Sequence, residues 1–202
     1  MRRLRLFLPV VALIVVGVFA AAAWRADLFG GGRAAPAGAA AIGGAFHLTD
    51  ETGRRVDQTI LKGKWTAVFF GYTSCPDVCP TTLFNLAQAI QALGPAARNF
   101  QVLFISIDPA RDSPAQLKAF LGNPAFPAGA IGLTGSAADV AAVAKAYHVY
   151  YQKAGDGPGY TMDHTSIVYL MDPGGAFVKP ITFDAPPSAV AAQIRQAMSE
   201  QG

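Results

Sequence analysis

The sequence predicts an α/β protein with a mixed sheet flanked by helices, and three observations carry this prediction. Short apolar runs of strand length alternate with longer segments whose apolar residues recur every three or four positions, as expected when crossover helices connect strands. A strand, a tight turn and a second strand follow one another near the C-terminus, which adds an antiparallel pair. The chain has 202 residues, of which 52% are hydrophobic and 14% charged. This composition excludes intrinsic disorder and is sufficient for one domain with a sizeable core.

The folded region begins with a predicted hairpin, a strand and a helix. Residues 46–50 and 55–57 surround a Thr-Gly turn and are predicted to pair as the hairpin. Residues 65–70 are an apolar run of strand length that leads into Gly-Tyr-Thr. In residues 83–93 the apolar side chains recur at helical spacing, and Gly94-Pro95 then stops the helix.

The following elements alternate in the same way. Residues 101–107 are rich in Val, Leu, Phe and Ile and predict a buried strand. Ser113-Pro114 is a helix-start signal, and a further helix is predicted over residues 136–147. Residues 166–171 and 177–181 flank Pro-Gly-Gly and are predicted to form the antiparallel pair.

A last helix, predicted over residues 187–199, completes the pattern. This order of elements suits a thioredoxin-like fold with extra N-terminal elements, although periodicity alone does not separate that fold from other α/β sandwiches. We predict that the thioredoxin-like domain occupies residues 45–202.

The N-terminus carries the features of a membrane anchor. Arg2, Arg3 and Arg5 are followed by 19 positions without a charged residue, from 6 to 24. About 20 apolar residues cross the hydrocarbon core of a bilayer. Because the basic end stays in the cytoplasm, we predict that residues 1–25 form a single-pass helix of the inner membrane and that the globular domain faces the periplasm.

A cleaved signal peptide is the alternative interpretation of this segment, because the alanines at residues 20–23 offer small residues for a signal peptidase. Both interpretations imply export. Residues 26–44 are rich in Gly and Ala and are predicted to form a flexible tether.

The basic excess of the chain lies at its N-terminus. The sequence has 16 Lys and Arg against 13 Asp and Glu, and without the three N-terminal arginines the counts are 13 and 13. No stripe of Lys and Arg follows later in the chain. The charge pattern therefore gives no support to nucleic-acid binding.

The two cysteines, Cys75 and Cys79, lie four residues apart after a predicted strand and directly before a predicted helix. A structural disulfide over so short a segment would constrain the unfolded chain little. The N-terminus of a helix stabilises thiolate, which is both the nucleophile in disulfide exchange and a ligand for soft metals such as copper(I) or zinc. The spacing is one residue longer than in the redox motif C-x-x-C and is compatible with a shared metal ion or with a disulfide.

A third ligand would favour the metal site, and the candidates are the three histidines. His47 lies near the start of the predicted hairpin and His148 follows a predicted helix, positions typical of structural or surface histidines. His164 lies on a Gly/Asp-rich loop just before a buried strand. A sheet could bring that loop beside the cysteines, so His164 is the candidate ligand.

Three motifs follow one another along the chain: residues 71–80 (GYTSCPDVCP), residues 105–112 (ISIDPARD), and residues 163–165 (DHT) followed by 169–173 (YLMDP). They resemble the SCO/SenC family of membrane-anchored, thioredoxin-like copper chaperones, which serve assembly of the copper A centre of cytochrome c oxidase. The resemblance spans about residues 45–198, and the anchor and tether also match the layout of the family.

The resemblance implies that Cys75, Cys79 and His164 bind copper. Two thiolates and one imidazole suit copper(I), whereas copper(II) would take a further oxygen or nitrogen donor. The implied partners are the copper A subunit of cytochrome c oxidase, an upstream copper donor, and a thiol reductant that opens the disulfide favoured by an oxidising periplasm.

Other functions would use the same cysteines. Some members of the family are thought to reduce the cysteines of the target, so a thiol–disulfide oxidoreductase is the alternative. A copper or redox sensor would need the same residues. A peroxiredoxin-like peroxidase is disfavoured, because the Pro-Asp-Val between the thiols does not match the motif of a peroxidatic cysteine.

The neighbours of the three candidate ligands have expected roles of their own. Each of Asp77 and Asp163 can either cap its loop or support a ligand, and we expect Asp77 to act as a cap. Met162 is a soft donor but is expected to pack in the interior. Residues 108–112 are expected to shape a turn and a helix start, with Arg111 paired to a nearby acid.

Overall fold

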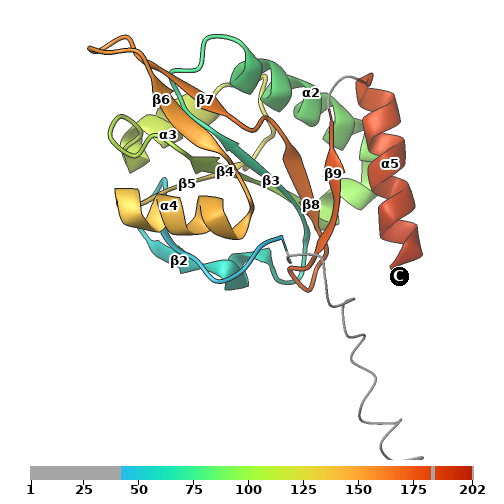
Figure 1. Ribbon diagram of the computed structural model, residues 1–202. Helices are drawn as coiled ribbons and strands as arrows, with labels where there is room; N and C mark the ends of the chain where they lie inside the picture. Colours follow the sequence, from blue (N-terminus) through green and yellow to red (C-terminus); the bar gives the residue numbers. More distant parts are fainter. Residues whose placement is uncertain (1–41, 183–184, 202) are drawn as a thin grey trace, which may run out of the picture. The chain divides into compact units, whose positions relative to one another are not determined.

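Seven of the described strands share one sheet, namely β1 (His47–Asp50), β2 (Arg55–Asp57), β3 (Trp65–Gly71), β4 (Phe100–Ser106), β5 (Ile131–Thr134), β8 (Val168–Met171) and β9 (Phe177–Ile181). The computed structural model describes residues 42–182 and 185–201. The strand order is β2-β1-β5-β4-β3-β8-β9 (Figure 1). β3, β4 and β5 are parallel, and the other strands add in antiparallel fashion at both sides, so the predicted mixed sheet is confirmed.

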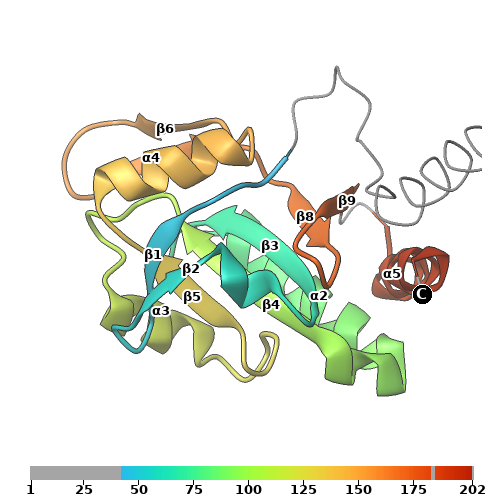
Figure 2. The ribbon, with the colours of Figure 1, turned by 90° about the horizontal axis from the view of Figure 1, so that it is seen from below.

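The described helices are α2 (Val78–Leu93), α3 (Pro114–Leu121), α4 (Ala137–Ala146) and α5 (Pro187–Glu200), with short 3-10 helices η1 (Gln58–Leu61) and η2 (Gly94–Asn99). Figures 1 and 2 show α4 on one face of the sheet and α2 and α3 on the other, with α5 packed beside α2. The hydroxyls of Ser113 and Ser136 cap α3 and α4 by accepting backbone N–H groups of the first turns.

Within the described part of the chain, no helix is long and apolar enough to cross a membrane. The predicted anchor, residues 1–25, lies outside the described residues, as does the predicted tether up to residue 41. The anchor and the tether therefore stay predictions.

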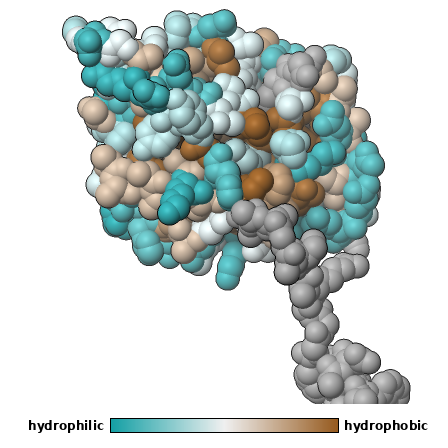
Figure 3. Space-filling model, in the orientation of Figure 1, coloured by the Kyte–Doolittle hydropathy of each residue, from teal (hydrophilic) through white to brown (hydrophobic). Residues whose placement is uncertain are grey.

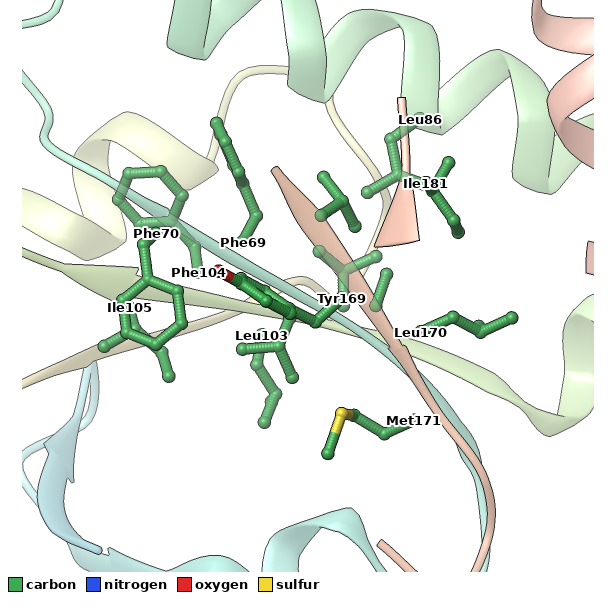
Figure 4. Packing of buried hydrophobic residues seen from close by; sticks show 14 of the residues in the cluster. Phe69, Phe70, Leu86, Leu103, Phe104, Ile105, Tyr169, Leu170, Met171 and Ile181 are labelled. Carbon is green, nitrogen blue, oxygen red and sulfur yellow. The ribbon is translucent and has the colours of Figure 1, made fainter. Parts of the chain in front are cut away.

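The central parallel strands form the middle of the core. All seven residues of β3 are buried, as expected of a strand covered on both faces by helices. Figure 4 shows the aromatic side chains of β3 packed beside Phe104 of β4 and Tyr169 of β8. The rings of Phe69 and Phe104 meet edge to face with centroids 5.8 Å apart, and those of Phe70 and Tyr169 do so at 6.0 Å. This packing fixes the end of β3, where the loop with the cysteines begins.

Two further strands, β6 (Tyr151–Ala154) and β7 (Thr161–His164), pair with each other as a separate antiparallel ribbon. In its register Tyr151 lies opposite His164. Figure 1 shows the ribbon at the upper left, and the surface there is largely hydrophilic in Figure 3. The prediction that His164 lies on a loop was wrong. Two four-residue strands joined by a Gly-rich turn give a pattern too short to detect by alternation.

β5 was also missed, because Gly132 interrupts its apolar pattern. A Cβ at this position would lie 2.9 Å from Leu121 Cδ1 and 3.0 Å from Leu117 Cβ. Glycine therefore lets α3 approach the strand closely. The other predicted strands and helices are present, but α2 begins at Val78, so that Cys79 lies inside its first turn and not, as predicted, directly before the helix.

Candidate metal centre

The two cysteines lie where β3 passes into α2. Cys79 is fully buried in the first turn of α2, and Cys75 is partly exposed in the preceding loop. Both thiols are free. The backbone N–H of Cys75 donates to the Tyr72 carbonyl at 3.2 Å, which folds the loop back on the end of β3. The N–H of Cys79 in turn donates to Cys75 Sγ at 3.4 Å.

This last hydrogen bond makes the Cys75 sulfur the cap of α2. The backbone N–H of the second residue in a helix has no acceptor within the helix. A side-chain oxygen of the N-cap residue, the one just before the first helical residue, usually accepts this hydrogen bond. Asp77 occupies that preceding position, but its side chain makes no capping hydrogen bond. It accepts instead from the Thr81 hydroxyl at 3.3 Å. The predicted capping role of Asp77 was wrong, because the sulfur of Cys75 already takes the N–H of Cys79.

His164, the last residue of β7, faces the cysteines. Its Nε2 lies 3.9 Å from Cys79 Sγ, and its Nδ1 lies 3.1 Å from the Thr165 carbonyl oxygen. A carbonyl can only accept a hydrogen bond, so Nδ1 carries the proton and the lone pair of the neutral ring is on Nε2. The Tyr72 ring meets the imidazole edge to face at 6.0 Å. The nitrogen free to bind a metal ion is thus the one directed at the buried sulfur.

A cavity of about 300 Å³ lies between the cysteine loop and β7, lined among others by Cys75, Val78 and His164. Over residues 42–182 and 185–201, no three side chains of His, Cys, Asp or Glu stand in a ready-made metal-binding arrangement. The three candidate ligands meet in pairs instead. Thiolate and imidazole bonds of about 2.3 and 2.0 Å place the donor atoms roughly 3.5–4 Å apart, so the 3.9 Å pair fits a shared ion. Cys75 caps the same turn and lines the same cavity as His164.

The two thiols differ in acidity. The hydrogen bond from the Cys79 thiol outweighs burial and, with the backbone N–H groups of Cys79 and Asp77, lowers the pKa of Cys75 to about 5. The same thiol pairing, followed by burial, raises the pKa of Cys79 far above its ordinary value. At neutral pH the pair therefore holds one thiolate, on Cys75, and one thiol, on Cys79.

This asymmetry predicts selective alkylation of the metal-free reduced protein. Iodoacetamide should modify Cys75 at a rate that is nearly constant from pH 8 to pH 6 and falls as the pH drops through about 5, since the thiolate is the reactive form. Cys79 should stay unmodified until the protein is unfolded. Mass spectrometry with fragmentation of the peptide would measure both rates, and a rate for Cys75 that falls tenfold for each pH unit below 8 would contradict the lowered pKa.

A family model described as SCO1/SenC matches residues 34–199. The chain belongs to the SCO1/SenC family. Among its relatives, the mitochondrial SCO1 homolog 1 of Arabidopsis thaliana is 43% identical over 145 residues, which are 71% of this chain and 43% of that protein. The chain thus spans less than half the length of this relative.

The solved structures similar to this chain include Sco proteins with copper bound. The copper-bound ScoI of Bradyrhizobium japonicum is 46% identical, with a TM-score of 0.71 over 78% of this chain and 99% of that one. The copper-bound Sco1 of yeast is 36% identical, with a TM-score of 0.73 over 79% of this chain and 89% of that one. The mixed sheet flanked by helices matches the thioredoxin-like structures of these proteins, as the element order predicted.

The other residues that the sequence singled out are not among the three candidate ligands, Cys75, Cys79 and His164. His47 lies beside a separate cavity of about 450 Å³ that contains no cysteine, and His148 is exposed after α4. Met162 is partly buried and packs against the hydrophobic core, as predicted. Asp163 is exposed on β7 and, like Met162, lines the same cavity as His164, so its support of a ligand stays a prediction.

Residues 106–112, which run from the end of β4 toward α3, support the cysteine loop through hydrogen bonds. The buried carboxylate of Asp112 accepts from the Thr73 hydroxyl at 2.7 Å, from the Thr73 N–H at 3.1 Å and from the Ser106 hydroxyl at 2.7 Å. Burial raises the pKa of Asp112, although these hydrogen bonds favour its charged form. Arg111 pairs with Asp108, as the sequence predicted. The sequence analysis missed the contact of Tyr72 with His164 and the hydrogen bonds of Asp112 to Thr73. Asp112 and Thr73 are 39 residues apart, and the spacing of an isolated Tyr or Asp does not reveal such distant contacts.

Proposed function

We propose that this protein is a copper chaperone that binds copper through Cys75, Cys79 and His164 and delivers it to the copper A centre of cytochrome c oxidase. The observation that carries the proposal is the direction of His164, whose free Nε2 lies 3.9 Å from the buried sulfur of Cys79. The copper found in the related ScoI and Sco1 structures supports it. The proposed location is the periplasmic side of the inner membrane, with residues 1–25 as anchor and 26–44 as tether.

Soft ligands decide which ion is held. Thiolates select copper(I) over hard cations, and an imidazole completes a compact three-coordinate set. Because a bound thiol must lose its proton, loading at neutral pH releases the proton of Cys79, whereas Cys75 is already ionised. A disulfide offers no thiolate, so a reductant must act before an upstream donor loads the site.

Transfer to the oxidase subunit would proceed by ligand exchange at the open side of the cavity. Cys75 is partly exposed there, and the side chain of Val78 beside it is 45% exposed. An incoming thiolate can therefore reach copper next to Cys75, while Cys79 stays buried behind it. A membrane anchor on donor and acceptor would raise their effective concentrations.

Replacing His164 by Ala tests the metal site. Copper(I) affinity should fall by at least about tenfold, and the spectrum of the copper(II)-loaded protein should change, since the site loses its one nitrogen donor. The measurement is anaerobic competition with a copper(I) chelator, together with optical and paramagnetic resonance spectra. His148→Ala is the matched control, because His148 is exposed and does not line the cavity. Equal affinity and spectra for His164→Ala and the wild type would remove His164 from the site.

A thiol–disulfide oxidoreductase is the second candidate function, and the unequal acidity of the thiols favours it. In that reaction the Cys75 thiolate attacks a disulfide of the target and expels one of its sulfurs as a thiolate. Cys79 then attacks the mixed disulfide, so that the target leaves as a dithiol and Cys75–Cys79 is oxidised. The deciding assay follows reduction of an oxidised copper A domain without copper. His164→Ala should leave this rate unchanged, and no reduction by the wild type would exclude the function.

A further inference from the structure

We propose that Arg111 is a positioning residue that holds the β6–β7 ribbon, and with it His164, against the cysteine loop. The inference rests on the proposed copper site and adds the residue that keeps its two halves together. The two cysteines are supported by β3 and α2, whereas His164 ends a ribbon that pairs with no strand of the main sheet in the described residues. An isolated pair of strands is marginally stable, so something else must fix this ribbon in place.

Arg111 contacts the ribbon at Tyr160, the residue just before β7. Its guanidinium carbon lies 3.6 Å from the centroid of the Tyr160 ring, and its Nη1 donates to the Tyr160 carbonyl at 2.9 Å. A stacked cation and a charged hydrogen bond therefore act on the same residue. His164 follows four residues later, at the end of the strand that Tyr160 leads into.

A buried carboxylate orients the guanidinium. Asp108 is 3% exposed and pairs with Nε of Arg111. Its other oxygen accepts from the Tyr160 hydroxyl at 2.7 Å. Asp108 and Arg111 thus hold Tyr160 at its backbone, its ring face and its hydroxyl. Lys153 also lies 4.3 Å from the ring centroid, but it belongs to β6 and moves with the ribbon.

The same short segment also holds the cysteine side. Asp112 binds Thr73 by two hydrogen bonds, and the guanidinium of Arg111 lies 5.7 Å from the ring of Tyr72, which itself touches His164. Residues 106–112 are therefore the common support from which the cysteine loop and the ribbon are placed. Removing the Arg111 contacts should release the ribbon and leave the cysteines where they are.

The first test uses Arg111→Met and needs no metal. Hydrogen exchange of the copper-free protein should become at least about tenfold faster in residues 151–154 and 161–164, with the start of α2 unchanged. The single variant Arg111→Met leaves the buried carboxylate of Asp108 without its cation and can therefore fold poorly. The double variant Arg111→Met/Asp108→Asn removes both charges, so it can be measured in place of the single variant. The matched control is Arg54→Met, since Arg54 also pairs with a buried aspartate, Asp50, but at the β1–β2 turn.

The second test measures copper. Both Arg111 variants should bind copper(I) about 10- to 100-fold more weakly, with copper(II) spectra that shift toward those of His164→Ala. The reduction potential of Cys75–Cys79 should stay at the wild-type value, as should all properties of Arg54→Met. Wild-type exchange in the ribbon, or faster exchange with wild-type copper affinity and spectra, would overturn the inference. A wild-type protein that binds no copper would overturn the proposed function instead. The hydrogen-exchange measurements would still show whether Arg111 holds the ribbon.

Discussion

Replacing either cysteine by serine is expected to abolish tight copper(I) binding. A hydroxyl is a hard, weakly acidic donor, and it cannot substitute for a thiolate on a soft ion. Loss of a residue that merely supports a ligand costs about 10- to 100-fold in affinity, so loss of a thiolate ligand should cost at least about 100-fold. Anaerobic competition with a copper(I) chelator measures this, with Ser74→Ala, an exposed neighbour, as the control.

The two serine variants should differ in stability although they share the copper defect. Cys79 is fully buried, so Cys79→Ser places a hydroxyl in the core and should lower the free energy of unfolding by about 1–3 kcal/mol. Cys75 is partly exposed, and a serine there can still accept the N–H of Cys79, so its stability should change little. Denaturant unfolding without copper checks the difference. Wild-type copper affinity in either variant would contradict a three-ligand site.

Gly71→Ala is expected to damage both the fold and the metal site. A Cβ at Gly71 would lie 2.8 Å from Cys79 Sγ and 2.9 Å from the Phe104 ring, closer than carbon atoms approach either group. Overpacking of this kind costs about 1–3 kcal/mol. The Phe104 ring is held by the rings of Phe69 and Phe120, whereas the Cys79 side chain turns about a single bond, so the sulfur should move away from β3 and change its distance to His164.

The measurements for Gly71→Ala are denaturant unfolding, copper(I) competition and the copper(II) spectrum. Gly159→Ala is the control, because nothing lies within 4 Å of a Cβ there. Destabilisation with an unchanged copper site would show that Phe104, and not Cys79, gives way. An unchanged stability would contradict the close packing behind the sulfur.

The parts of the fold that were predictable are those with long, regular patterns. β3 and β4 are seven-residue strands in which most side chains are apolar, and α2 repeats its apolar positions over four turns. The β6–β7 ribbon was not predictable from alternation, since each strand has four residues and lies outside the main sheet. Its existence decides where His164 lies, which is why a loop was expected there.

The candidate site divides in the same way. Cys75 and Cys79 could be found from spacing and from their place before a helix, because these are local features. The assignment of His164 as a candidate ligand depended on its contact with Cys79, which lies 85 residues away in the sequence. The spacing of residues could not predict that contact, whereas the family resemblance implied it. The cap on α2 shows the limit of local rules. Asp77 is a typical capping residue at the N-cap position, but the Cys75 sulfur accepts the hydrogen bond from the backbone N–H of Cys79.

The separation of the ligands between a sheet–helix junction and a small ribbon has a kinetic consequence. Local opening of a marginal element is far more frequent than global unfolding. An opening of the ribbon would remove the imidazole and leave copper on two thiolates, one of them at the surface. In the proposed site, the contacts of Tyr160 would then govern how often copper becomes open to an incoming thiolate, so a recipient protein could speed ligand exchange by competing for the ribbon.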